Sequence, residues 1–348
     1  MKNLTKRPLA AALAMAAASI LFLLLIAAPM QAAWGMTGLL LTELGLLALA
    51  LGGAALLREK LSDVFPLRAP RLRPAFGAVV LWLGAYMPVL TAAILMQLLL
   101  PAQTVEVSTG ITGLAVTVSP WLRFLIMAVS PAICEEAVYR GFILSHLGPL
   151  PAWARVAVCG ALFGAFHLDA TRFLSTALLG TAITWAVLCT GNLFYAGLIH
   201  LCNNALSVLA TIALEAAVQS APELAEQATA EAAAVTPATL GVYLVLCAAS
   251  PWLLWAGTAL LRGGPARPRR GRRALVCLGA SVLLAAAGVR LLAGCLPGPG
   301  KAGCAETDPQ ACTQASKMTK HPSGEAERLP RKGVFAWGSG AGGRIGRG

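Results

Sequence analysis

Long apolar stretches dominate the chain and alternate with short segments that carry most of its polar and charged residues. A helix needs about 20 mostly apolar residues to cross a bilayer. We predict spanning helices at 8–30, 34–57, 76–100, 121–146, 153–170, 172–190, 192–213, 237–261 and 274–296. The pattern therefore predicts an all-α, polytopic transmembrane helix bundle of about eight or nine spans.

The first stretch follows Lys2, Lys6 and Arg7, as the apolar core of a signal peptide would. Its apolar run is longer than the roughly 7–15 residues of such a core, and residues 30–32 form a poor cleavage site. We interpret this stretch as a retained membrane anchor.

The spans suggest four regions. Residues 1–115 would hold about three spans. Residues 116–213 would form the catalytic core, and residues 214–296 would hold the last spans. The tail at 297–348 is rich in Gly, Pro, Ser and Lys, a composition that predicts disorder. Within the first two regions, we expect 101–120 to be a connecting loop.

Composition agrees with the bilayer as the solvent. Of 348 residues, 57% are hydrophobic and 12% are charged, whereas soluble proteins carry about 25% charged residues. The formal net charge is +12, and basic residues gather at 58–75 and 262–273. No nucleic-acid-binding pattern accompanies that charge. We expect a bacterial inner (plasma) membrane protein whose N-terminus and basic loops are cytoplasmic, because Lys/Arg-rich loops stay inside.

Several ionisable side chains fall within the apolar stretches. At mid-bilayer such a side chain costs at least about 2.5–3.5 kcal/mol, so each invites a functional hypothesis. Glu136 and Arg140 are four residues apart, so they share a helix face and can form an ion pair. Glu135 points about 100° away from Glu136 and stays free for chemistry.

Two later stretches carry polar residues at the same depth. Phe163 and His167 share one helix face, and His200 and Asn204 share another. At 1.5 Å per residue, His167 and His200 lie about 12–18 Å from the cytoplasmic ends of their spans, as Glu135 does. Three helices would therefore bring these groups together near the midplane.

This combination of groups predicts hydrolysis. A carboxylate beside an imidazole can position and deprotonate a water, while a second imidazole and an amide can stabilise an oxyanion. Asn203 is the alternative to Asn204 as the inward-facing amide. Glu43 is isolated in the second stretch, and we interpret it as meeting a polar neighbour or lining an aqueous cavity rather than as catalytic.

Three motifs stand in order between about 118 and 213: Glu135-Glu136-x-x-x-Arg140, Phe163-x-x-x-His167 and His200-x-x-x-Asn204. The pattern resembles the CPBP family of intramembrane proteases. That family includes the type II CAAX prenyl endopeptidases and the bacterial Abi-type bacteriocin-processing and self-immunity proteins.

The resemblance implies an endopeptidase that cuts a membrane-associated or lipid-modified protein, or a leader peptide. It implies that Glu135 is the general base, assisted by His167. His200 and Asn204 would form the oxyanion hole, with the adjacent ion pair in support.

Alternatives remain open for the cofactor and for the function. Glu135, His167 and His200 are a candidate zinc shell of the His₂Glu type. The HExxH signature of many metalloproteases is absent, so we favour direct activation of water by Glu135. A catalytically silent scaffold or a self-immunity protein is one alternative function. A transporter is another, because intramembrane carboxylates and histidines suit proton relays.

Overall fold

The computed structural model describes residues 7–221, 235–263 and 270–295. Within these ranges the backbone forms helices joined by short turns, and no strand occurs. The predicted all-α class is therefore confirmed. The predicted disordered tail at 297–348 lies outside the described residues.

The helices and helical turns follow one another as α1 (Pro8–Phe22), η1 (Leu23–Ala27), α2 (Ala28–Leu56), α3 (Leu61–Val64), α4 (Leu72–Leu99), α5 (Pro101–Ala115), α6 (Pro120–Phe124), η2 (Leu125–Val129), α7 (Ser130–Glu136), η3 (Ala137–Ile143), α8 (Leu144–His146), α9 (Ala152–Phe166), α10 (Ala170–Thr190), α11 (Phe194–Ser220), α13 (Pro237–Leu246), η4 (Cys247–Ala249), α14 (Ser250–Leu261) and α15 (Arg270–Cys295).

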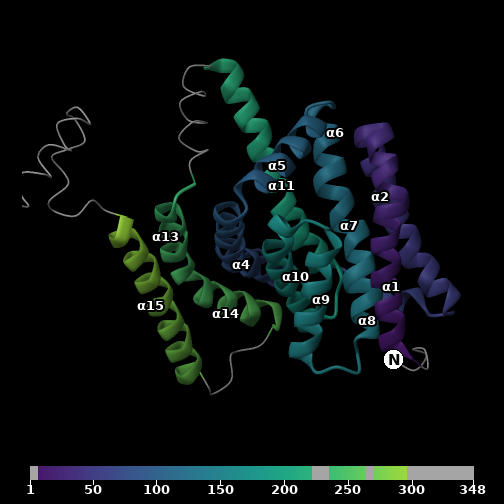
Figure 1. Cartoon of the computed structure of the whole chain (residues 1–348). Coiled ribbons are helices and arrows are strands. Elements are labelled where there is room, and N and C mark those ends of the chain that lie inside the picture. The colour runs from purple at the N-terminus through teal and green to yellow at the C-terminus, as the bar shows by residue number, and fades with distance from the viewer. Residues whose placement is uncertain (1–6, 222–234, 264–269, 296–348) are drawn as a thin grey trace, which may run out of the picture. The chain divides into compact units, whose positions relative to one another are not determined.

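The first two predicted spans form a helical hairpin. The backbone leaves the helical conformation at Gly35, where φ is 55° and ψ is −127°. Beyond this turn α2 returns along α1, so that Gly45 faces the Phe22 ring and Gly53 faces the Met15 side chain. Figure 1 shows α1 and α2 side by side. This pair of angles lies outside the left-handed helical region that other residues can adopt, so Gly35 permits the reversal.

The predicted span 121–146 is one continuous helical run that alternates between α and π turns. It comprises α6, η2, α7, η3 and α8 without a break in helical backbone angles. A π turn adds a residue to the helical turn and often accompanies a functional site. Here η3 begins directly after Glu136 and contains Arg140.

A second hairpin follows, in which α9 and α10 pack closely against each other. The connection between them turns at Leu168, whose φ is 51°. The Asp169 carboxylate then accepts a hydrogen bond of 2.8 Å from the Thr171 backbone N–H and so caps the first turn of α10. Small residues on α9, including Gly160 and Gly164, let the two backbones approach closely.

One prediction from the sequence was wrong in detail, whereas the predicted span 237–261 is confirmed by length and composition but is bent. The segment 101–120 is largely the helix α5 rather than a loop, and it starts with Pro101 at a position where a missing N–H does no harm. The predicted span 237–261 is bent at η4, just before Pro251 in the first turn of α14. Figure 1 shows α14 running at a steep angle to α13. A proline removes one backbone hydrogen bond and favours such a bend.

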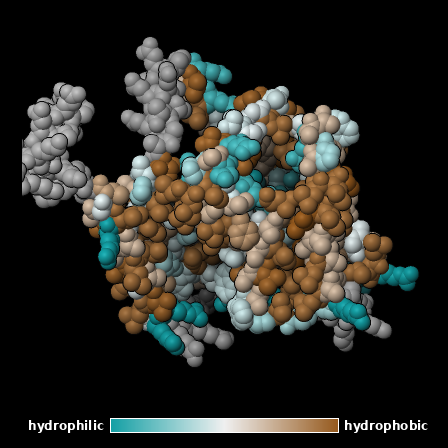
Figure 2. All heavy atoms as spheres, in the orientation of Figure 1, coloured by the Kyte–Doolittle hydropathy of each residue, from teal (hydrophilic) through white to brown (hydrophobic). Residues whose placement is uncertain are grey.

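The bundle is built for a lipid environment. By length and composition, six helical segments among the described residues can cross a membrane, and one of these, 8–56, is the N-terminal hairpin. Figure 2 shows apolar side chains over the side of the molecule, with hydrophilic residues gathered toward its upper and lower ends in that view. The protein is therefore an integral membrane helix bundle, as predicted.

We predict that Gly35→Ala lowers stability by about 1–3 kcal/mol, because alanine is strained at positive φ. Gly52→Ala is the matched control, since a Cβ at this helical position on the same hairpin meets nothing within 4 Å. Thermal unfolding in detergent should show a lower midpoint for Gly35→Ala and an unchanged or higher one for Gly52→Ala. Equal shifts in the two variants would contradict the assigned turn.

Candidate active site

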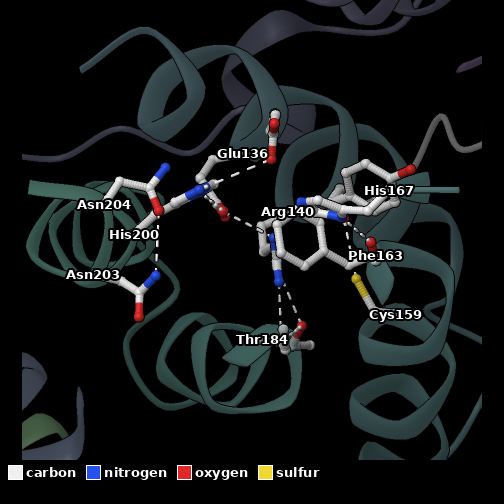
Figure 3. A network of polar contacts seen from close by, with 12 residues as sticks. Glu136, Arg140, Cys159, Phe163, His167, Thr184, His200, Asn203 and Asn204 are labelled. Carbon is white, nitrogen blue, oxygen red and sulfur yellow. Dashed lines mark hydrogen bonds and ion pairs between the residues drawn. The ribbon is translucent and has the colours of Figure 1, made fainter. Parts of the chain in front are cut away.

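A buried ion pair anchors the first motif. Arg140 Nη1 donates to Glu136 Oε1 at 2.8 Å, and both side chains are almost fully buried. Arg140 also donates from Nη2 to the Gly180 carbonyl at 3.1 Å and contacts the Thr184 hydroxyl at 3.4 Å. These partners, both on α10, tie the charged pair to a second helix (Figure 3). The ion pair predicted from the i,i+4 spacing is present.

The Phe163 ring closes this network from α9. The Arg140 guanidinium carbon lies 4.3 Å from the ring centroid, within range of a cation–π interaction. The same ring meets His167 and His200 edge-on, with centroid separations of 5.1 and 5.7 Å. The phenylalanine of the second motif thus spaces the two histidines and covers the arginine.

His200 reaches the ion pair from α11. Its Nδ1 lies 2.8 Å from Glu136 Oε1, the oxygen that also accepts from Arg140. Because an ionised carboxylate can only accept, Nδ1 carries the hydrogen. Nε2 is then the atom that faces Glu135, at 3.9 Å from its Oε2. Glu136 therefore orients His200 toward the carboxylate predicted to be the base.

His167 is held in the same tautomer by a different acceptor. It directly follows α9, and its Nδ1 lies 2.9 Å from the Phe163 carbonyl oxygen. A carbonyl oxygen can only accept, so the hydrogen sits on Nδ1 and the Nε2 lone pair is left over. Both site histidines thus have Nδ1 engaged and Nε2 available.

The two adjacent amides of α11 are linked to each other. Asn204 donates from Nδ2 to the Met127 carbonyl at 3.2 Å, and its Oδ1 accepts from Asn203 Nδ2, also at 3.2 Å. An amide nitrogen has two hydrogens, so Asn204 keeps one for another acceptor. Both amides line the same cavity, and the hydrogen bond from Asn203 helps to hold Asn204, so the choice between them as the oxyanion donor stays a prediction.

A cavity of about 470 Å³ collects most of the predicted site residues. Its wall includes Glu135, His167, His200, Asn203 and Asn204. The ion pair of Glu136 and Arg140 does not line this cavity and lies behind it. The structure therefore brings the side chains of three separate helical runs around one space, while their chemical roles stay predictions.

The cavity wall also contains two charged residues that the sequence did not assign to the site. Glu43 comes from α2, and Arg172 from the first turn of α10. Glu43 was expected to line an aqueous cavity, and an isolated carboxylate inside a span was the signal for it. Arg172 lies between two short apolar stretches. Basic residues are common in such loops, so nothing in the sequence signals that it belongs to the site.

The candidate zinc ligands do not form a shell as they are placed. Two imidazoles with free Nε2 atoms and a carboxylate have the chemistry of a His₂Glu site, including acceptors for both Nδ1 hydrogens. However, no group of three His, Cys, Asp or Glu side chains in the described part of the chain has the spacing of a metal site. His200 Nε2 and Glu135 Oε2, at 3.9 Å, stand farther apart than the roughly 3.4 Å expected of two ligands on one tetrahedral zinc.

We predict that Arg140→Ala destabilises the protein by about 3–5 kcal/mol, because Glu136 would become a buried charge without its partner. Arg123→Ala is the matched control. Arg123 is paired with Glu215 at 2.7 Å, but the Glu215 side chain is 30% exposed and can be hydrated. Arg123 itself is 3% exposed, but its loss leaves a carboxylate that water can solvate, so the loss should cost less than that of Arg140. Thermal unfolding in detergent compares the two, and similar midpoints would refute the role given to Arg140.

Comparison with known proteins addresses the segment that carries these motifs. Residues 117–206 match the family described as Type II CAAX prenyl endopeptidase Rce1-like. No curated protein and no solved structure matches the chain. The matched segment contains all three motifs, whereas α1 to α5 and α13 to α15 lie outside it. The match confirms, for the segment that carries all three motifs of this cavity, the resemblance to the CPBP family of intramembrane CAAX-type proteases.

Proposed function

We propose that this protein is an intramembrane endopeptidase that hydrolyses a peptide bond in a membrane-associated or lipid-modified protein, or in a leader peptide. One observation carries the proposal. Glu135, His167 and His200, from three separate helical segments, line one cavity inside an apolar bundle. A purely structural ion pair would not require the two imidazoles beside a second carboxylate.

In this proposal Glu135 activates the water. Its Oε2 has no hydrogen-bond partner among the described residues, so it can accept a hydrogen from water. His167 offers Nε2 as a second acceptor, so one water can be held between the two groups. As the water oxygen adds to the peptide carbonyl carbon, its proton passes to Glu135.

The carbonyl oxygen then carries the developing negative charge. Asn204 supplies its remaining Nδ2 hydrogen, and in this proposal His200 donates from Nε2 in its doubly protonated form. Such donors stabilise the tetrahedral intermediate. When the C–N bond breaks, the proton held by Glu135 moves to the leaving amine, which restores the carboxylate.

We assign the protein to a bacterial inner membrane with a cytoplasmic N-terminus. The two basic segments support this orientation. Arg73 Nη1 donates to the Gly263 carbonyl at 3.2 Å, so the segment 58–75 and the start of 262–273 lie on the same side of the bundle. Under the positive-inside rule that side faces the cytoplasm.

We predict that Glu135→Ala and His167→Gln reduce peptide cleavage by at least about 100-fold, because the first removes the carboxylate base and the second replaces the imidazole nitrogen with a far less basic amide. His146→Gln is the matched control for the second variant. His146 Nδ1 contacts the Phe142 carbonyl just as His167 contacts Phe163, but His146 does not line this cavity. Cleavage of peptides by the folded variants would be measured in detergent.

If Glu135→Ala cleaves peptides as fast as the unmodified protein, catalysis by this site is refuted and a scaffold function is favoured. A loss for His146→Gln as large as for His167→Gln would show that the effect is structural.

We further predict that activity survives prolonged treatment with a strong chelator, because Glu135 and the two imidazoles can activate water directly. Cleavage would be measured before and after chelation, and after adding back Zn²⁺. A loss of at least about tenfold on chelation that Zn²⁺ restores would replace direct water activation with a zinc-dependent mechanism.

A further inference from the structure

The N-terminal hairpin contributes an acidic residue to the candidate active-site cavity. Glu43, on α2, is 4% exposed and lies in the cavity wall together with Glu135. This residue lies outside the segment 117–206 that matches the endopeptidase family. The chemistry of the three motifs therefore does not account for it.

No group of the described protein neutralises this carboxylate. Glu43 Oε2 has no hydrogen-bond partner, and no described basic side chain forms an ion pair with the residue. The adjacent Thr42 hydroxyl donates to the Gly38 carbonyl and accepts from Gln31, so it is already engaged. Glu43 is thus a buried carboxylate that lacks a counterion.

The cavity as a whole has an excess of acid. Glu136 is balanced by Arg140 behind the wall, but Glu43 and Glu135 share the cavity itself. Arg172 is the basic residue of that wall, and its side chain is exposed and makes no ion pair to a described residue. Much of the remaining wall is apolar, with leucines from η1, α2, α5 and α10. In such surroundings an unpaired carboxylate is unfavourable, and a cation supplied by the ligand would offset its charge.

We propose that Glu43 is a specificity residue that binds the basic side chain of a lysine or arginine in the substrate, close to the bond that is cut. The inference rests on the proposed peptidase function and adds the chemistry of one substrate position. A buried carboxylate that gains an ammonium or guanidinium partner forms a charge-assisted hydrogen bond. A neutral side chain of equal length leaves the carboxylate unpaired. The cavity would thereby distinguish basic from neutral peptides.

The test compares peptides that differ only in one side chain. A series carries lysine, or its neutral isostere norleucine, at each position near the scissile bond, and kcat/KM is measured for the full-length protein in detergent. At one position the unmodified protein should prefer lysine by at least about tenfold, as expected for a buried charge pair. Glu43→Gln should remove that preference, because kcat/KM should fall at least about tenfold more for the lysine peptide than for the norleucine peptide.

Two further variants sharpen the comparison. Glu43→Lys should shift the preference at that position toward glutamate. Glu59→Gln is the matched control, because Glu59 is a buried carboxylate that lines a different cavity. It should keep the preference for lysine. Thermal unfolding of each variant verifies that it is folded.

Several outcomes would overturn the inference. Equal cleavage of lysine and norleucine peptides at every position would do so. An equal loss on both peptides in Glu43→Gln would assign the residue to proton transfer or to packing instead.

A binding measurement separates this inference from the proposed function. Fluorescence anisotropy of the same peptides with Glu135→Ala should show tighter binding of the lysine peptide, and the double variant with Glu43→Gln should abolish the difference. If no peptide is cleaved but this binding preference is found, the peptidase function fails and the role of Glu43 stands. If the preference is absent, the inference fails whether or not peptides are cleaved.

Discussion

The buried carboxylate of Glu136 constrains the arrangement of the helices around it. A charge at this depth is tolerated only when its partners are held in place. Glu136 Oε1 meets both Arg140 and His200 at 2.8 Å, and the backbone of α10 holds Arg140 in turn through the Gly180 carbonyl. The helical run of α7 and η3, together with α10 and α11, must therefore meet in one register. The same contacts aim His200 Nε2 at Glu135, so the charge that stabilises the bundle also orients the candidate chemistry.

The orientation of the two histidines gives the cavity an unusual balance of hydrogen-bonding groups. His167 and His200 both direct Nδ1 to an oxygen and are left with Nε2, while Glu135 can only accept when it is ionised. Donors must therefore come from Asn204, from His200 in its doubly protonated form, from water or from the substrate. In the proposed reaction the acceptors hold the attacking water, and the donors stabilise the charge on the peptide carbonyl oxygen.

The candidate site is assembled from two parts of the chain, of which only one matches a known family. The segment 117–206 carries the motifs and the family match, on which the proposed reaction type rests. The hairpin of α1 and α2 closes the cavity from outside that segment and brings Glu43. This division would let the hairpin adapt the choice of substrate while the catalytic groups stay unchanged.

The sequence by itself determined the spans and the contacts within one helix, because hydrophobic length and i,i+4 spacing are local properties. The pair of Glu136 and Arg140 is the clearest example. Tertiary structure alone decided the engagement of His200 with Glu136, the place of Glu43 in the cavity and the reversal at Gly35. These features depend on contacts between distant helices. In a membrane protein an apolar or isolated polar residue can face lipid, a neighbouring helix or a cavity. The local sequence is the same in each case, so only the packing of the helices decides which of these surrounds it.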